Sequence, residues 1–321
     1  MPLHLLPRHS TTRRHVIKTL AAAGAAAVLP GSRLPARAAN QDDASGGDTA
    51  ERWALLADTH IPDDPATAAR GVNMTDHFRR VGAELIAEAG RAPLQGVIIN
   101  GDCAYLKGLK GDYENLAELL DPLVEAGLSV HLTMGNHDDR GPFYQVLADH
   151  KPERPVVDGQ HVALLETPLA DWYLLDSLRF VDQVEGELGE AQRRWLAERL
   201  ARNPDKPAIL AAHHYLQPED PPGGEPRRMT GLVDSAGFVE LLAQHPQAKA
   251  FLFGHSHRWH VAADDNGCHL VNLPPTAYVF DAQRPSGWVL ATVTATGMTL
   301  ELRSLDPDHP EHGIETRLAW R

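Results

Sequence analysis

Five short motifs rich in histidine and carboxylate side chains follow one another along the chain. The motifs are Asp58-Thr59-His60, Gly101-Asp102, Gly135-Asn136-His137-Asp138, His213-His214 and Gly254-His255-Ser256-His257. Carboxylates and imidazoles in one site favour zinc, manganese or iron over calcium or a metal that thiolates select. A lone histidine or a lone Gly-Asp pair carries little information, but five such elements in one order predict a transition-metal site.

Each motif comes after a short, mostly apolar run. The runs cover residues 53–57, 97–99, 130–132, 208–212 and 251–253. Runs of this kind indicate strands that are buried on both faces. Because functional groups of open α/β sheets gather at the carboxyl ends of the strands, we expect the motifs to meet at one rim.

The spacing inside the motifs suits metal binding. In Asp58-Thr59-His60 an extended backbone would point residues i and i+2 the same way, so both side chains could bind one ion. The same argument applies to the two imidazoles of His255 and His257. Glycines stand close before Asp102, Asn136 and His255, where they would permit sharp turns and a close approach of the backbone.

The remaining pattern predicts helices between these strands, and hence an α/β fold. Apolar residues recur at helical spacing over residues 75–89, 113–120, 190–200 and 235–244, with Asp112 as a candidate N-cap. Further strands are expected over residues 269–273, 288–294 and 298–303. Residues 218–228 are rich in Pro and Gly, so they form either a plain surface loop or part of a substrate rim.

The N-terminal segment has the features of an export signal. Residues 1–38 carry basic residues and no acid; Arg13-Arg14 resembles a twin-arginine motif, and a largely apolar stretch and Ala36-Arg37-Ala38 follow. We predict a twin-arginine-type signal peptide over 1–38, a linker over 39–50 and one domain over 51–321, with periplasmic or extracellular localisation. The apolar stretch is too short to span a bilayer, so no stable membrane insertion is expected. The alternative is an irregular basic terminus with an Ala-rich helix.

The net charge limits the possible partners, and the cysteine content limits the possible disulfides. The formal net charge is −13, although the first 38 residues are basic. An acidic body excludes long nucleic acid as a partner, because such binding needs clustered Lys and Arg. A small phosphoester remains possible, since bound metal ions can dominate the local field. Cys103 and Cys268 are the only cysteines, too few for a disulfide framework, although one bridge between them stays open.

The ordered motifs resemble those of the calcineurin-like metallophosphoesterase superfamily over about residues 52–260. That resemblance implies a four-layer α/β/β/α sandwich, with helices flanking two central sheets, and two divalent or mixed-valence transition-metal ions (Fe, Mn or Zn). One ion would be held by Asp58, His60 and His257. The other would be held by Asn136, His213 and His255, with Asp102 bridging both. His213 is preferred to His214 because the family's ligand directly ends the strand.

The run from Gly135 to Arg140 is similar to that of the cyclic-nucleotide and glycerophosphodiester phosphodiesterase branch. The resemblance implies a phosphodiesterase for small diesters, in which a metal-bound hydroxide attacks phosphorus in line. His137 would donate a hydrogen bond or proton to the leaving oxygen, and Asp138 would orient its ring. Arg140 would hold a phosphate oxygen, or else serve the structure.

Three alternatives accompany this interpretation. One is an exported phosphomonoesterase of the acid-phosphatase type, and another is a non-catalytic protein that binds metal or phosphate. The third concerns Gly101-Asp102-Cys103-Ala104-Tyr105, which resembles the motif that supplies a tyrosinate iron ligand in purple acid phosphatases. Those enzymes usually lack the first-motif histidine, present here as His60, so Tyr105 is expected to be a pocket or packing residue.

Overall fold

The computed structural model describes residues 50–152, 154–220 and 224–320. The predicted signal peptide over 1–38, and the linker apart from its last residue, lie outside the described residues. The described residues all belong to one compact unit. Among them, no helix combines the length and the apolar character that crossing a membrane requires.

The first sheet has six strands and carries the first three motifs. Its order is β14 (Glu315–Ala319), β13 (Gly297–Ser304), β12 (Gly287–Thr294), β1 (Glu51–Leu56), β4 (Gly96–Asn100) and β5 (Val130–Thr133). Strands β1, β4 and β5 are parallel, while β12, β13 and β14 are antiparallel to their neighbours. The parallel strands therefore end at the same edge, where the motifs begin.

The second sheet also has six strands and carries the last two motifs. Its order is β10 (His260–Ala263), β11 (His269–Asn272), β9 (Ala248–Phe253), β8 (Ala208–Ala211), β7 (Asp171–Leu174) and β6 (Ala163–Glu166). Strands β7, β8, β9 and β11 are parallel to one another, whereas the edge strands β6 and β10 are antiparallel to their neighbours. A separate hairpin is formed by β2 (Ala68–Ala69) and β3 (Val72–Asn73).

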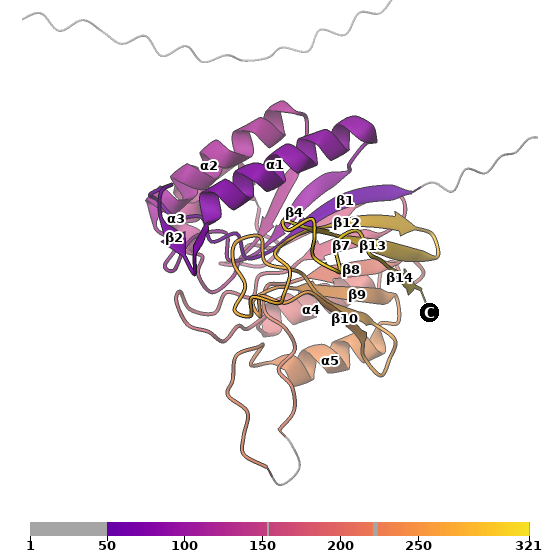
Figure 1. Cartoon of the computed structure of the whole chain (residues 1–321). Helices are drawn as coiled ribbons and strands as arrows, with labels where there is room; N and C mark the ends of the chain where they lie inside the picture. The colour runs from indigo at the N-terminus through magenta and orange to yellow at the C-terminus, as the bar shows by residue number, and fades with distance from the viewer. Residues whose placement is uncertain (1–49, 153, 221–223, 321) are drawn as a thin grey trace, which may run out of the picture. The chain divides into compact units, whose positions relative to one another are not determined.

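The described part of the chain also contains five α-helices and a short 3-10 helix. They are α1 (Met74–Arg91), α2 (Lys110–Glu125), α3 (Arg140–Val146), η1 (Ala148–His150), α4 (Glu190–Leu200) and α5 (Ser235–Gln244). In Figure 1, α1 and α2 lie side by side. The predicted helices are present, but α2 begins earlier than expected. Asp112 is therefore not the N-cap: Leu109 takes that position, and its backbone N–H donates to Asp112 Oδ2 at 2.8 Å.

Three apolar clusters define the layers. Helices α1 and α2 pack on one face of the first sheet, and α4 and α5 pack on one face of the second. The third cluster joins the inner faces of the two sheets; within it the rings of Trp53 and Trp172 lie 4.9 Å apart. This arrangement is the predicted four-layer α/β/β/α sandwich. Cys103 and Cys268 are both buried free thiols, so the possible bridge between them does not form.

The ends of the two sheets are joined by a buried side chain that directly precedes a motif. Asn100 ends β4, and its Nδ2 donates to Ala212 O at 3.0 Å, just beyond β8. Its Oδ1 accepts from Thr133 Oγ1 at 2.7 Å, at the end of β5. These bonds hold strand ends of both sheets together, which fixes where the motifs can meet.

Candidate metal centre

The motifs converge at the carboxyl ends of β1, β4, β5, β8 and β9. Two groups of three predicted ligands have ligand atoms within 4.8 Å of one another: Asp58, His60 and His257, and Asp102, His213 and His255. A third such group, His60, Asp102 and His137, shares a member with each of these two. The sequence separates the first and last of these residues by about 200 positions. Only the packing of the two sheets brings them to one place.

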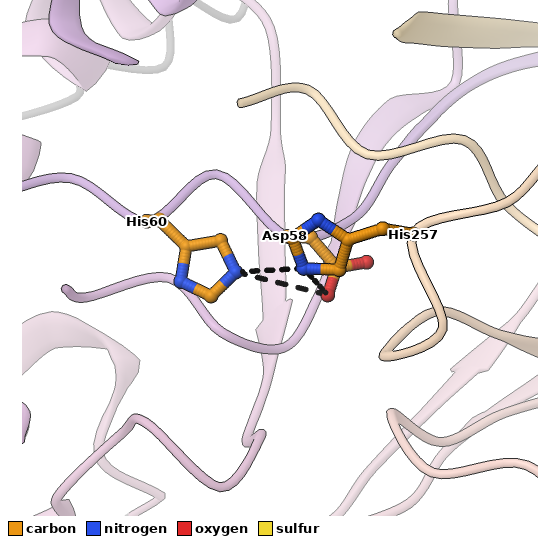
Figure 2. A group of neighbouring side chains, drawn as sticks. All are labelled: Asp58, His60 and His257. Atoms are coloured by element: carbon orange, nitrogen blue, oxygen red, sulfur yellow. Dashed lines mark hydrogen bonds and ion pairs between the residues drawn. The ribbon is translucent and has the colours of Figure 1, made fainter. Parts of the chain in front are cut away.

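The first group is almost completely buried. His257 Nε2 lies 3.3 Å from Asp58 Oδ1 and 3.1 Å from His60 Nε2, and Figure 2 shows the three side chains pointing at one another. His60 Nε2 is 4.0 Å from the same Asp58 oxygen. One carboxylate oxygen and two imidazole nitrogens thus face a common point, which is a donor set that transition metals accept.

Asp102 belongs to the second group and also lies close to the first. Its Oδ2 atom is 3.1 Å from His213 Nε2 in the second group and 3.8 Å from His60 Nε2 in the first. His213 directs its other nitrogen, Nδ1, to Asn100 O at 2.9 Å. The neighbouring His214 instead bonds Ser177 Oγ through Nδ1 at 2.8 Å, and it joins neither group.

Three buried polar atoms of the candidate ligands lack a hydrogen bond. They are Nδ1 of His60, Oδ1 of Asn136, which lines the adjoining pocket, and Nε2 of His213, whose approach to Asp102 lacks hydrogen-bond geometry. Leaving a buried donor or acceptor unsatisfied is costly, so such atoms need an explanation. Two metal ions would supply partners for Asn136 Oδ1 and His213 Nε2, and the donor types fit such ions.

The backbone at the centre is strained in a way that the sequence did not predict. Five of the candidate ligands adopt positive φ, at 52° for Asp58, 46° for His60, 47° for Asp102, 65° for His255 and 52° for His257. The expectation of an extended Asp58–His60 segment was therefore wrong. Left-handed backbone at residues other than glycine costs about 1 kcal/mol or more each, and such strain is concentrated at functional sites.

Two glycines permit the close approach of the motifs. A Cβ at Gly135 would collide with the carboxylate and the backbone nitrogen of Asp102, and a Cβ at Gly254 would lie 2.5 Å from Asp58 Oδ2. Both acidic side chains therefore pack against bare backbone. The expected role of the motif glycines is confirmed at these two positions and at Gly101, which has a φ of 74° and where a Cβ would lie 2.5 Å from His213 Cβ.

Protonation in the metal-free protein is set by burial and by the two carboxylates. Burial lowers the pKa of His60 to about 3 and that of His255 to about 4. Burial also disfavours the charged form of His213, but the nearby carboxylates of Asp102 and Asp58 outweigh it and raise its pKa to about 9. The Asp58 carboxylate likewise raises the pKa of His257. In the metal-free protein, the protonated imidazoles of His213 and His257 thus compensate the negative charges of the Asp58 and Asp102 carboxylates.

His137 lies beside the centre, but a different group orients its ring. Its Nδ1 contacts Leu106 O at 2.5 Å and lies 3.8 Å from Asp182 Oδ1. The expectation that Asp138 orients this ring was wrong. Asp138 is fully buried and accepts hydrogen bonds from backbone N–H groups of Ala104 and Gly135, at 3.0 and 2.9 Å. It therefore ties the second motif to the third.

Arg140 has the structural role, the second of the two predicted for it. Its Nε and one terminal nitrogen bind the two carboxylate oxygens of Asp176 at 2.7 and 2.8 Å, and the same nitrogen donates to Leu178 O at 2.7 Å. The Asp176 side chain is fully buried. With the guanidinium bound in this way, Arg140 braces the start of α3 and does not line the pocket.

Sequence reasoning missed residues that act through backbone carbonyls or ring faces. Tyr278 O accepts from His257 Nδ1 at 2.6 Å, and the Tyr278 ring stacks on His60 with centroids 5.2 Å apart. Leu106, whose carbonyl contacts His137, has a positive φ of 57°. Any residue type has a carbonyl, so no motif in the sequence marks these positions.

A pocket of roughly 860 Å³ opens beside the two groups. Its lining includes His60, Asp102, Asn136, His137 and His255, together with apolar and aromatic side chains from both sides of the cleft. Pro218 also lines it, so the first residue of the irregular segment 218–228, which the sequence left as loop or rim, contributes to the rim. A small anionic molecule could reach the candidate ligands from this pocket.

A four-layer sandwich with a carboxylate–imidazole centre at its strand ends defines a class of metal-dependent hydrolases. The family model for calcineurin-like phosphoesterases matches residues 52–259. The chain belongs to this family, as its motifs predicted, and it is a metal-dependent phosphoester hydrolase.

Individual proteins that resemble this chain are also named as phosphoester hydrolases. The 3′,5′-cyclic adenosine monophosphate phosphodiesterase CpdA of Escherichia coli is 27% identical over 260 residues, covering 80% of this chain and 87% of that protein. A cAMP/cGMP dual specificity phosphodiesterase of Mycobacterium tuberculosis is 27% identical over 217 residues, covering 63% of this chain and 60% of that protein. The fold is shared with a dimetal phosphatase from Danio rerio, at a TM-score of 0.63 and 14% identity, covering 84% of this chain and 99% of that one.

Proposed function

We propose that the chain hydrolyses small phosphodiesters and that 3′,5′-cyclic nucleotides are its substrates. The observation that carries this proposal is the position of Asp102, which belongs to one group of candidate ligands, lies 3.8 Å from His60 of the other and shares a third group with His137. The names of the relatives, both cyclic-nucleotide phosphodiesterases, supply the substrate class.

In this proposal Asp58, His60 and His257 would hold one ion, Asn136, His213 and His255 would hold the other, and Asp102 would serve both. Iron, manganese and zinc are the ions that fit carboxylate, amide and imidazole donors. Bound ions would supply Lewis acidity toward the phosphoryl oxygens. The buried Asn136 Oδ1 and His213 Nε2 support this assignment, because each lacks a hydrogen bond from the protein.

His137 is proposed to serve the leaving oxygen. Its Nδ1 contacts Leu106 O, which leaves Nε2 as the nitrogen available to a substrate in the pocket. A proton on Nδ1 donates to that carbonyl, and the Asp182 carboxylate lies 3.8 Å from the same nitrogen. A protonated His137 could then donate from Nε2 to the oxygen that departs from phosphorus.

The test compares esters on the same metal-replete protein. Turnover of bis(p-nitrophenyl) phosphate, p-nitrophenyl phosphate and cAMP is measured after chelation and after addition of Fe, Mn or Zn. We expect both diesters to be hydrolysed with higher kcat/KM than the monoester, and chelation to abolish turnover. Preference for the monoester would favour the phosphomonoesterase alternative, and metal uptake without any turnover would favour a binding protein.

We also propose that the chain is exported through the twin-arginine route. Arg13 and Arg14, the apolar stretch that follows them and Ala36-Arg37-Ala38 support this localisation. Replacing both arginines with lysine should retain the protein in the cytoplasm at its precursor size. If the variant and the native protein distribute alike between cell fractions, the export proposal is wrong.

A further inference from the structure

The pocket extends past the candidate ligands onto the edge of the second sheet. Phe253 of β9 pairs with Asn272 of β11, which pairs in turn with His260 of β10. Leu270 of β11 and Ala262 of the edge strand β10 form the next paired row on the same face. Paired residues share a face of a sheet, and all five line the pocket. They form the floor of a second lobe, which we call the β11 lobe.

The β11 lobe is continuous with the candidate metal centre. The Tyr215 ring lies 5.8 Å from the His255 ring and 6.3 Å from the Phe253 ring, measured between centroids. His255 belongs to the second ligand group, and Phe253 belongs to the floor. A molecule with its phosphate at the ligands can therefore place its remaining part on the floor.

The chemistry of the β11 lobe is that of a site for a planar heterocycle. Phe253 and Leu270 of the floor, together with Tyr215, line the lobe with apolar and aromatic side chains. Its one buried amide belongs to Asn272, which is 7% exposed. Asn272 Nδ2 donates to Ser256 Oγ, whereas Asn272 Oδ1 is buried and has no hydrogen-bond partner. The floor thus presents one buried acceptor that has no partner in the protein, with the exposed imidazole of His260 paired beside it.

We propose that the β11 lobe binds the base of a nucleotide substrate and that Asn272 Oδ1 accepts a hydrogen bond from an exocyclic amino group on that base. This inference rests on the proposed function, which places the phosphate at the candidate ligands. A free acceptor selects a donor, so amino-bearing bases are preferred to bases that lack the amino group. Asn272 is then a specificity-determining residue.

The experiment uses ligands that differ only in the amino group. AMP and purine riboside 5′-monophosphate compete with bis(p-nitrophenyl) phosphate, and calorimetry of the metal-replete protein measures their binding directly. We expect AMP to bind about five- to tenfold more tightly, the effect of one neutral hydrogen bond. In Asn272→Ala the two nucleotides should bind with equal affinity, whereas Asn272→Asp, which keeps the acceptor, should retain the preference for AMP. The ratio compares two ligands on one protein, so a change in metal content does not mimic the result.

A second pair of variants tests the location without touching Asn272. Ala262 is exposed on the floor, and its neighbour Ala263 is exposed on the opposite face of β10. Ala262→Trp should fill the lobe and weaken AMP at least tenfold while leaving inorganic phosphate unchanged, and Ala263→Trp should change neither.

The outcomes separate this inference from the proposed function. Equal affinities of the two nucleotides for the native protein, or an unchanged ratio in Asn272→Ala, would overturn the inference while diester hydrolysis stands. Failure to hydrolyse any diester would overturn the proposed function, and the calorimetric ratio would still decide whether the base site exists.

Discussion

The His213 imidazole and the Asp102 carboxylate lie 3.1 Å apart, Nε2 to Oδ2, and both side chains are buried. His213 follows β8 of the second sheet, and Asp102 follows β4 of the first. Their approach therefore depends on how the two sheets pack. Without a metal, a proton on His213 supplies the positive charge that the carboxylate requires, and this has a measurable consequence.

Metal affinity should depend on pH through His213. Its pKa of about 9 means that the folded, metal-free protein carries this proton below pH 9, whereas a metal needs the neutral imidazole. Affinity should therefore fall as the pH is lowered from 9 to 7, by about tenfold per pH unit for each proton displaced. Chelator competition at pH 7, 8 and 9.5 measures this slope. A flat response between pH 7 and 9 would contradict the assignment of His213.

The contact between Gly135 and Asp102 predicts the effect of one added methyl group. Gly135→Ala should displace the Asp102 carboxylate and lower metal content at least severalfold, with about 1–3 kcal/mol lost in stability from overpacking. Metal analysis of the purified variant measures the loss. Gly90→Ala is the control: nothing lies within 4 Å of the added carbon in α1, so it should bind metal normally. Full metal content in Gly135→Ala would show that Asp102 is not a ligand.

Replacement of His137 should reduce catalysis without reducing metal binding. His137→Ala should keep both metals and lower kcat by about 10²- to 10⁴-fold, the usual contribution of a proton donor in the transition state. Metal content and kcat are measured on the same preparation. His137 also has a nitrogen within 4.8 Å of ligand atoms of His60 and Asp102. Loss of metal in the variant would therefore reassign His137 as a ligand.

Arg140 should matter for stability and not for substrate affinity. Arg140→Met leaves the fully buried Asp176 carboxylate without its bidentate partner, so the free energy of unfolding should fall by about 3 kcal/mol. KM should be unchanged. Urea denaturation with steady-state kinetics checks both. Arg194→Met, which removes an exposed pair with Glu190, should cost less than about 1 kcal/mol. A large rise in KM with native stability would restore the phosphate-binding role.

The sequence by itself determined the residue types of the centre, their order and the strands that carry them. Apolar runs before each motif predicted β1, β4, β5, β8 and β9, because buried strands need continuous apolar side chains on both faces. The family resemblance assigned the ligands and the four layers. These features depend on side-chain chemistry and local pattern, which the sequence states directly.

Only the tertiary structure decided how the groups around the centre are used. Arg140 is bound by Asp176, a residue 36 positions away, and the His137 ring contacts the carbonyl of Leu106. The left-handed backbone at Asp58 and His60 replaced the expected extended segment. Carbonyl partners and strained backbone conformations are imposed by packing between distant segments, and any residue type can provide a carbonyl, so they leave no pattern that a sequence alone can show.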